Sequence, residues 1–163
     1  MNMKKLVFIT SFLLYFSFVF GQTKDNLTTE KNTTMPGNVF YVDFSTLACR
    51  DFIEILKANN PSKTDHLITT ANKAPKNWIQ KRDIGFLISL IDSKEPTRCI
   101  VENIASTLPF KDSATMGGYA MDLIDAFRLH KTYPFNLTSC PKNDSTRQKT
   151  ILQWWDKYKI EKN

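Results

Sequence analysis

The sequence is poor in the residues and motifs on which most enzymes depend. It has two histidines, His66 and His130, and neither lies in a His-Glu-x-x-His zinc motif. There is no Gly-x-Ser-x-Gly nucleophile elbow, and the five glycines form no phosphate-binding loop. We therefore expect a protein that is not an enzyme and that needs no metal or cofactor.

Long hydrophobic runs are also scarce, and the one that is present lies at the N-terminus. Lys4 and Lys5 precede an apolar run from Leu6 to Phe20, and the sequence turns polar after Gly21. A run of about 15 residues is short for a membrane span of about 20 residues, so it is typical of a secretory signal peptide. Its composition resembles bacterial export signals. We predict a signal peptide over residues 1–21, export to the periplasm or the extracellular space, and no transmembrane segment in the mature chain; the alternative is a membrane anchor.

No dense run of lysine and arginine with interleaved aromatic residues occurs, so nucleic-acid binding is not expected. The formal charge of +6 falls to about +4 once Lys4 and Lys5 are removed, and this mild positive balance favours acidic partners. The candidate partner-binding residues are a basic cluster ahead of the middle of the chain and one tryptophan near its end: Lys73, Lys76, Lys81, Arg82 and Trp155. The alternative is that the basic cluster is a solvated turn and helix end.

Residues 22–38 are rich in threonine and asparagine and lack an apolar period, which predicts a flexible polar leader. Residues 39–163 then form one domain. Val39 and Tyr41 are compatible with a short extended segment, but a lone strand has no partner, so no sheet is expected.

Apolar residues recur at helical spacing through most of the domain. Ile84, Leu87, Ile88 and Ile91 follow the i, i+3, i+4, i+7 pattern, and similar stripes occur elsewhere. Six helices arranged as three helix-turn-helix pairs are predicted: 44–59 with 62–73, 78–92 with 95–108, and 114–130 with 145–160. The fold class expected from this pattern is all-α, with about five to six helices whose antiparallel pairs stack as a short solenoid or form a helical bundle.

The stacked pairs resemble a short HEAT-type α-solenoid over residues 78–158. The resemblance rests on repeated apolar positions, turn acids and the partial Pro and Arg landmarks: Leu87, Ile91, Ile100, Ile104, Leu123, Phe127, Asp92, Asp112, Pro96 and Arg98. It implies a surface that binds proteins or peptides along one face, and it assigns no individual binding residue.

The three cysteines, Cys49, Cys99 and Cys140, allow one disulfide and one free thiol. Cys49 lies near the apolar side of the first predicted helix and is expected to be a buried core residue. Cys140 lies in a proline-bounded loop that a tether would stabilise, which favours a Cys99–Cys140 disulfide. A Cys49–Cys99 bridge, or no bridge, remains an alternative.

Three other features have both a structural and a functional interpretation. Gly117 and Gly118 at a helix start allow close backbone approach, or alternatively an anion site. Asp122 and Asp125 are expected to be solvated charges on the outer face of their helix instead of an acid pair. His130 occupies a favourable position near a helix C-terminus.

Three functions are compatible with these patterns. The first is an exported, non-catalytic module that binds another protein with an acidic surface, for example as a periplasmic immunity or inhibitor protein. The second is a small-ligand-binding or structural envelope protein that uses its aromatic residues: Trp78, Trp154, Trp155 and Tyr158. The third is an enzyme with an unrecognised site that uses Asp122, His130 or Cys140.

Overall fold

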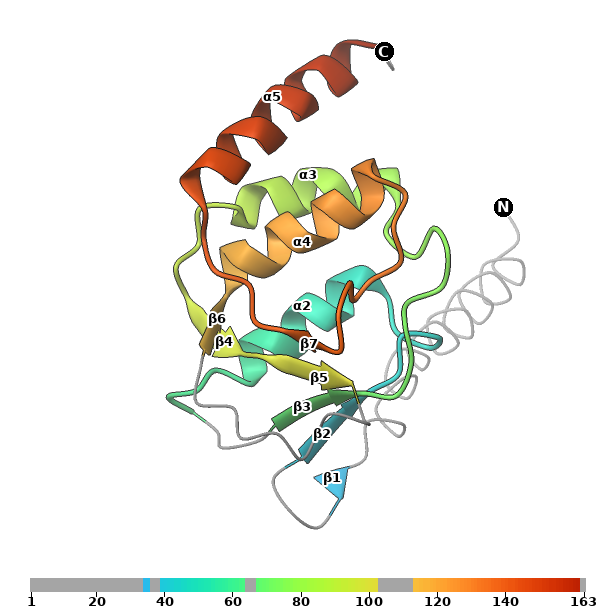
Figure 1. Cartoon of the computed structure of the whole chain (residues 1–163), viewed down its shortest axis with the longest axis vertical. Helices are drawn as coiled ribbons and strands as arrows, with labels where there is room; N and C mark the ends of the chain where they lie inside the picture. The colour runs from blue at the N-terminus through green and yellow to red at the C-terminus, as the bar shows by residue number, and fades with distance from the viewer. Residues whose placement is uncertain (1–33, 36–38, 64–66, 103–112, 162–163) are drawn as a thin grey trace, which may run out of the picture. The chain divides into compact units, whose positions relative to one another are not determined.

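A computed structural model describes residues 34–35, 39–63, 67–102 and 113–161 (Figure 1). These residues belong to one compact unit, Asn32–Asn163. The predicted signal peptide and most of the predicted polar leader lie outside the described residues. Two residues of that leader are described, and they form a short strand.

The main sheet has five strands in the order β1-β2-β3-β5-β7. The strands are β1 (Thr34–Met35), β2 (Val39–Val42), β3 (Leu67–Thr70), β5 (Ile100–Glu102) and β7 (Thr138–Ser139). The three central strands run parallel, with Phe40 opposite Ile68 and Ile68 opposite Ile100. Both edge strands, β1 and β7, run antiparallel to their neighbours. A second sheet pairs β4 (Pro96–Arg98) with β6 (Ser113–Thr115).

Four helices accompany the sheets in the described part of the chain: α2 (Cys49–Ala58), α3 (Lys81–Leu90), α4 (Met116–Arg128) and α5 (Ser145–Glu161). Helix α2 connects parallel strands β2 and β3, and α3 lies between β3 and β5 along the chain. Such crossovers are the usual connection between parallel strands. Figure 1 shows α2, α3 and α4 on one side of the sheet.

The all-α prediction is wrong, because two predicted helices are strands. The predicted helix 62–73 contains β3, and the predicted helix 95–108 contains β4 and β5. Ile68 and Thr69 on β3 and Ile100 and Val101 on β5 point to opposite faces of the sheet, and all four are buried. A strand buried on both faces reads as a continuous apolar run, which short-range periodicity cannot distinguish from a helix.

The other predicted helices form, with changed ends. The patterns at 78–92, 114–130 and 145–160 correspond to α3, α4 and α5. The predicted helix 44–59 begins only at Cys49, because Asp43 Oδ1 accepts a 2.8 Å bond from the Ser45 amide and holds the preceding residues in a turn.

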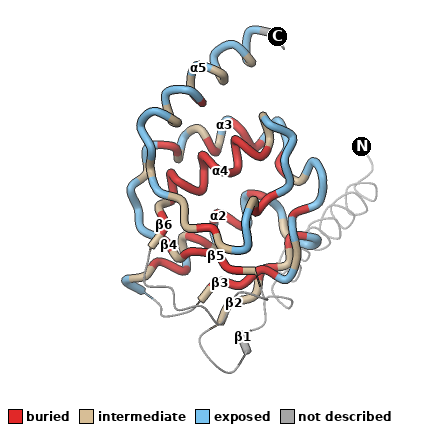
Figure 2. The backbone as a smooth tube through the Cα atoms, viewed as in Figure 1, coloured by how far each residue is buried: buried red, intermediate tan, exposed pale blue. Residues whose placement is uncertain are grey.

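Helix α4 is the centre of the domain, and every residue from Met116 to Ala126 is buried (Figure 2). It contacts α2, α3 and α5. Met116, Ala120, Leu123 and Ile124 are fully buried in the core. Helix α5 contrasts with α4, because Ile151 is its one fully buried residue among those described (Figure 2).

Gly117 and Gly118 permit the close approach of two other segments to the start of α4. A Cβ atom on Gly117 would lie 2.5 Å from the Ile91 carbonyl oxygen, and one on Gly118 would lie 2.5 Å from the Pro141 carbonyl carbon. The predicted close backbone approach at this glycine pair is confirmed.

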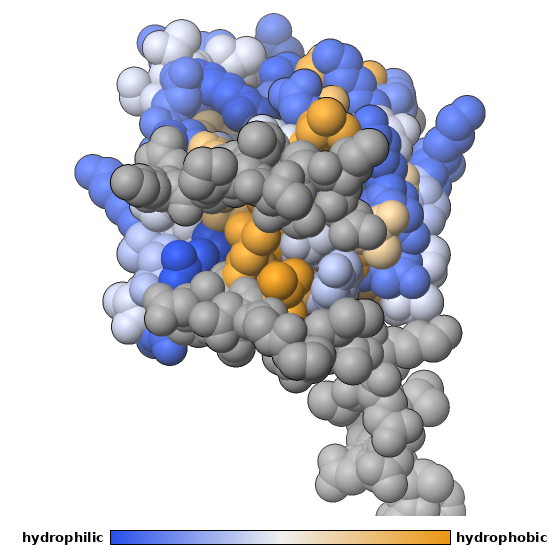
Figure 3. Space-filling view, turned by 60° about the horizontal axis from the view of Figure 1, so that its bottom comes forward, coloured by the Kyte–Doolittle hydropathy of each residue, from blue (hydrophilic) through white to orange (hydrophobic). Residues whose placement is uncertain are grey.

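The sheet face opposite α2, α3 and α4 carries Val39, Tyr41 and Leu67, which are half-buried. Figure 3, in which the bottom of the molecule as seen in Figure 1 is turned forward, shows hydrophobic residues gathered in the middle of the visible surface. The helix-covered face therefore holds the main core, and the opposite face is also apolar.

Candidate functional site

The carboxyl ends of the parallel strands carry the pockets of interest. The loop after β2 leads into α2, and the loop after β3 leads into α3, so both loops lie at the same edge of the sheet. Open α/β sheets generally bind ligands at this edge. One pocket involves residues 45–51 and a second involves residues 74–79, and both include Asn77 and Trp78.

The second pocket, here called the Trp78 pocket, has a volume of about 340 Å³. It is bordered by residues 74–79, by Ala126 and Phe127 at the end of α4, and by residues 130–133. Its floor is apolar, because Ala74, Ile79 and Ala126 are buried there. This volume lies at the lower end of the range for small-ligand sites.

Trp78 is fixed in orientation by contacts on both its polar edge and its ring. Its Nε1 donates a 2.5 Å hydrogen bond to the Leu47 carbonyl oxygen. Its ring is nearly parallel to that of Tyr133, with centroids 6.5 Å apart, and meets Phe44 edge-on at 4.9 Å. The pocket is therefore built on a rigid aromatic group and needs little rearrangement to bind a ligand.

Two tight turns form the rim. Asn77 (φ 60°) and His130 (φ 51°) are the described non-glycine residues with positive φ, and both line this pocket. His130 belongs to a Schellman cap of α4, in which the Lys131 amide donates to the Ala126 carbonyl at 2.9 Å. The Ala74 amide donates to the Tyr133 carbonyl at 2.7 Å and joins the two sides of the pocket.

The charge around the Trp78 pocket has one sign. Lys76 and Lys131 are exposed on the rim, His130 lies beside them, and none of the described lining residues is acidic. The neighbouring pocket differs, because Arg50 and Arg82 are balanced there by Asp51 and Asp83. An anionic group is thus favoured at the Trp78 pocket.

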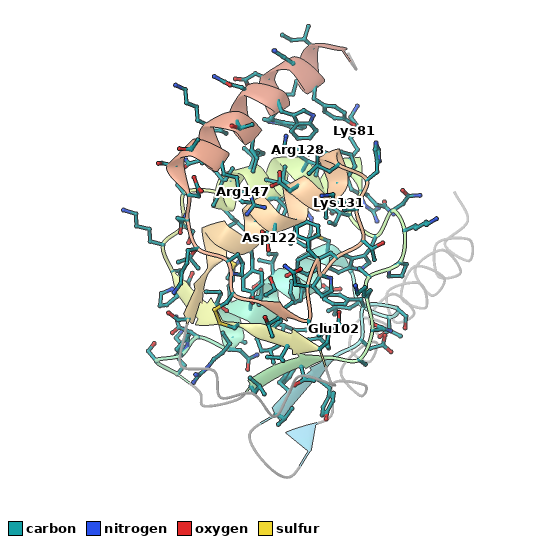
Figure 4. All side chains as sticks on the ribbon, viewed as in Figure 1. Lys81, Glu102, Asp122, Arg128, Lys131 and Arg147 are labelled. Carbon is teal, nitrogen blue, oxygen red and sulfur yellow. A yellow bond between two sulfur atoms is a disulfide. The ribbon has the colours of Figure 1, made fainter. Side chains whose placement is uncertain are left out.

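Helix α5 extends this surface with aromatic rings. Phe127 lines the pocket and also packs edge-on against Trp154 and Tyr158, at 6.3 and 6.1 Å. The Lys81 ammonium lies 5.8 Å from the Tyr158 ring centroid, on the side of the molecule where Figure 4 also labels Lys131. We call this surface the cationic aromatic face and define it as Lys76, Lys81, Lys131, Phe127 and Tyr158.

The structure brings together three of the five predicted partner-binding residues. Lys76 and Lys81 belong to the cationic aromatic face, and Trp155 adjoins it, because its ring lies 5.8 Å from that of Tyr158. Lys73 lies 3.9 Å from Glu102, so its charge is partly balanced. Arg82 lines the neighbouring pocket.

Other residues that line the Trp78 pocket were missed by sequence reasoning. Lys131 and Thr132 follow α4 and gave no motif, and Ala126 resembles any other helix residue. The four aromatic residues proposed for ligand binding are also divided by the fold. Trp78 packs in the core beside the pocket, whereas Trp154, Trp155 and Tyr158 cluster on α5.

The prediction that Asp122 and Asp125 are solvated is wrong, because they are 8% and 6% exposed. Arg147 on α5 joins both: Nη1 lies 2.8 Å from Asp122 Oδ1, and Nε donates to Asp125 Oδ2 at 2.6 Å. Arg128 donates to the other oxygen of Asp125, and Ser139 donates to Asp122 at 3.3 Å. Burial raises the pKa of Asp122 above its ordinary value, although the bonds from Arg147 act in the opposite direction.

The alternative anion site at Gly117 and Gly118 is already filled by protein groups. The Gly117 amide donates to the Ser93 carbonyl at 2.9 Å, and the Gly118 amide donates to Thr115 Oγ1 at 3.1 Å. Thr115 is therefore the N-cap of α4. These donors are not available to a bound anion.

The cysteines adopt the arrangement that the sequence favoured. Cys99 and Cys140 form a disulfide with a Cα–Cα distance of 4.5 Å. Cys49 is free and buried, and burial, with a smaller effect of Asp83, raises the pKa of its thiol to about 12. A thiol with this pKa is protonated at neutral pH and is a poor nucleophile.

The three residues considered for catalysis do not share one site. Asp122 is held by Arg147, Cys140 is in the disulfide, and His130 lies on the pocket rim. His66 lies outside the described residues. Among the described residues, no group of three or more His, Cys, Asp or Glu side chains is placed to hold a metal ion.

No protein-family profile, curated protein or solved structure matches this chain. The resemblance to HEAT-type repeats is therefore wrong, since the comparisons do not support it and the domain contains a five-stranded sheet. Fold and site define a small α/β domain with a rigid pocket rimmed by lysines. No helix in the described segments is long and apolar enough to cross a bilayer.

Proposed function

We propose that this protein is an exported, non-catalytic binding protein that engages an acidic partner protein through the cationic aromatic face. The observation that carries the proposal is the Trp78 pocket, where an apolar floor meets a lysine rim and no described lining residue is acidic. Buried aromatic groups surrounded by charged rim residues are typical of protein-binding hot spots.

Export is supported by two independent features. The N-terminal 21 residues have the composition of a signal peptide. The Cys99–Cys140 disulfide fits an oxidising compartment, where such bonds persist. We propose the periplasm or the extracellular space as the location, and an immunity or inhibitor protein as a subclass, since such proteins need only a rigid surface.

Affinity purification from the native envelope fraction tests this function. The wild type should capture a partner with an acidic surface, and the Lys76→Glu/Lys131→Glu variant should lose it, because the reversed charges repel carboxylates. The matched control is Lys63→Glu/Lys149→Glu, which makes the same charge change at exposed lysines outside the Trp78 pocket. Equal capture by both variants would contradict the proposal.

A small-ligand-binding protein is the second candidate, because the Trp78 pocket is large enough for a small apolar molecule. Trp78 fluorescence would then respond to lipid, glycan or small aromatic acids in a Trp154→Phe/Trp155→Phe chain, where Trp78 is the remaining tryptophan. A lack of response across these panels would argue against this second function.

A further inference from the structure

The Trp78 pocket is hollow because small side chains stand where larger ones would fill it. Ala74 and Ala126 are 4% and 3% exposed and lie at the floor, beside the rings of Trp78 and Phe127. An apolar hollow of this kind is completed by an apolar group from outside the domain, which would remove its surface from water.

The rim adds a second requirement. Lys76 and Lys131 stand on the two turns that border the pocket, and the link from Ala74 to Tyr133 fixes those turns relative to each other. The border of the pocket therefore carries one exposed lysine from each turn. A neighbouring carboxylate on the same ligand would be attracted, and a neighbouring cation would be repelled.

We infer that the Trp78 pocket receives one large apolar side chain, preferably aromatic, from a short acidic segment of the partner protein, with flanking carboxylates placed at Lys76 and Lys131. This inference rests on the proposed function and adds the chemistry of the segment that is recognised. The side chain packs on Ala126, Phe127 and Trp78, and the carboxylates select the segment and orient it.

The site is preorganised for this task. Trp78 is held through its Nε1 bond to Leu47, and the Schellman cap of α4 closes the other side of the pocket. Because the pocket exists before binding, little conformational entropy is lost when the side chain enters. We call the large apolar side chain that enters the pocket the anchor. The affinity for a peptide should therefore depend more on this anchor than on the length of the peptide.

Calorimetric titration of the full, oxidised chain with three blocked pentapeptides tests the inference. The probe is acetyl-Glu-Glu-Phe-Glu-Glu-amide. One comparison peptide has alanine at the centre, and the other keeps phenylalanine but has lysine at the four flanking positions. The probe should bind at least about tenfold more tightly than the alanine peptide, which is the order expected for burying a phenyl ring. The lysine-flanked peptide should not bind measurably.

Two variants locate the binding. Ala126→Met fills the pocket from its floor and should reduce affinity for the probe to that of the alanine peptide. Lys131→Glu should weaken both acidic peptides by a similar factor. The control is Lys63→Glu, because Lys63 precedes β3 and so lies at the opposite edge of the sheet. Thermal unfolding of each variant checks its fold, and Lys131→Glu remains decisive if Ala126→Met is unstable.

The outcomes separate this inference from the proposed function. Equal affinity for the phenylalanine and alanine peptides, with no effect of Ala126→Met, would overturn the anchor while leaving an acidic partner in place. Equal binding of the acidic and lysine-flanked peptides would overturn the charge selection. If no peptide binds but the envelope partner is still lost in Lys76→Glu/Lys131→Glu, the anchor is wrong and the proposed function stands.

Discussion

Arg147 on α5 holds the carboxylate of Asp122 on α4, with Nη1 2.8 Å from Oδ1. The same guanidinium reaches Asp125 through Nε, so one side chain serves two buried acids. Its planar fork suits this double contact, which a lysine ammonium cannot reproduce. Helix α5 is thereby fastened to the buried central helix near its first turn, close to its buried residue Ile151.

Replacing Arg147 should destabilise the fold. Arg147→Met leaves the mostly buried Asp122 carboxylate without its arginine partner and leaves Asp125 paired with Arg128 alone. We expect a loss of about 2–3 kcal/mol in unfolding free energy, because Arg147 itself is partly exposed. Denaturant unfolding measures the change. Lys149→Met, two residues further on α5 and exposed, is the control and should change stability by less than about 0.5 kcal/mol. If Arg147→Met also lost less than about 0.5 kcal/mol, a structural role for the contacts of Arg147 with Asp122 and Asp125 would be contradicted.

The dependence of stability on pH should change in Asp122→Asn. Burial raises the pKa of Asp122 above 3.8, so the folded state takes up a proton at higher pH than the unfolded state. The carboxyl therefore adds stability as the pH falls through its raised folded-state pKa towards 3.8. When the pH is lowered from 7 to 4, the unfolding free energy of the wild type should increase relative to that of Asp122→Asn. A shift in the other direction would mean that the Arg147 ion pair outweighs burial.

Removal of the disulfide should cost more than any single surface change. The bond closes a separation of 41 residues, for which the chain-entropy model gives about 3–4 kcal/mol. Cys99→Ala/Cys140→Ala should therefore unfold at a clearly lower denaturant concentration than the wild type. Thiol titration provides the check on the pairing. The wild type should show no reactive thiol when folded and one when unfolded, which is Cys49, and two or three thiols in the unfolded chain would contradict the bond.

Glycine substitutions should have opposite effects in two helices. Gly118→Ala places a Cβ against the Pro141 backbone and should cost about 1–3 kcal/mol, because backbone atoms must move. Gly85→Ala in α3 meets no atom within 4 Å and should stabilise the domain by about 0.5–1 kcal/mol through helix propensity. Thermal unfolding of the two variants tests the contrast. Equal effects would mean that the segment at Pro141 is not packed against α4.

The sequence was informative where an element follows a local period. Ile84 and Leu87 lie at helical spacing within α3, Ile91 continues the pattern as the C-cap of that helix, and the glycine pair marks the crowded start of α4. The sequence pattern was misleading where an element is stabilised by residues that are distant along the chain. Strands β3 and β5 are each three or four residues long and are stabilised by neighbours about 30 residues away, so Ile100 and Val101 matched a helix pattern as well as a strand.

The same limit applies to the candidate site. Lys76 and Lys81 belong to a visible basic cluster, so sequence reasoning selected them. Lys131 joins them only because the turn after α4 lies against the loop after β3. The small side chain of Ala126 makes a hollow only in relation to Trp78 and Phe127. Asp122 and Asp125 were predicted to be solvated, because their partner, Arg147, lies more than 20 residues further along the chain.

The burial of α4 from Met116 to Ala126 has a consequence for the order in which the domain can form. Residues Met116–Ala126 supply the middle of the core, yet they come in the last third of the chain. Until that stretch is available, α2 and α3 lack the helix that both of them contact, so the preceding strands and helices cannot complete their core. A nascent chain can therefore complete its core only late in its synthesis.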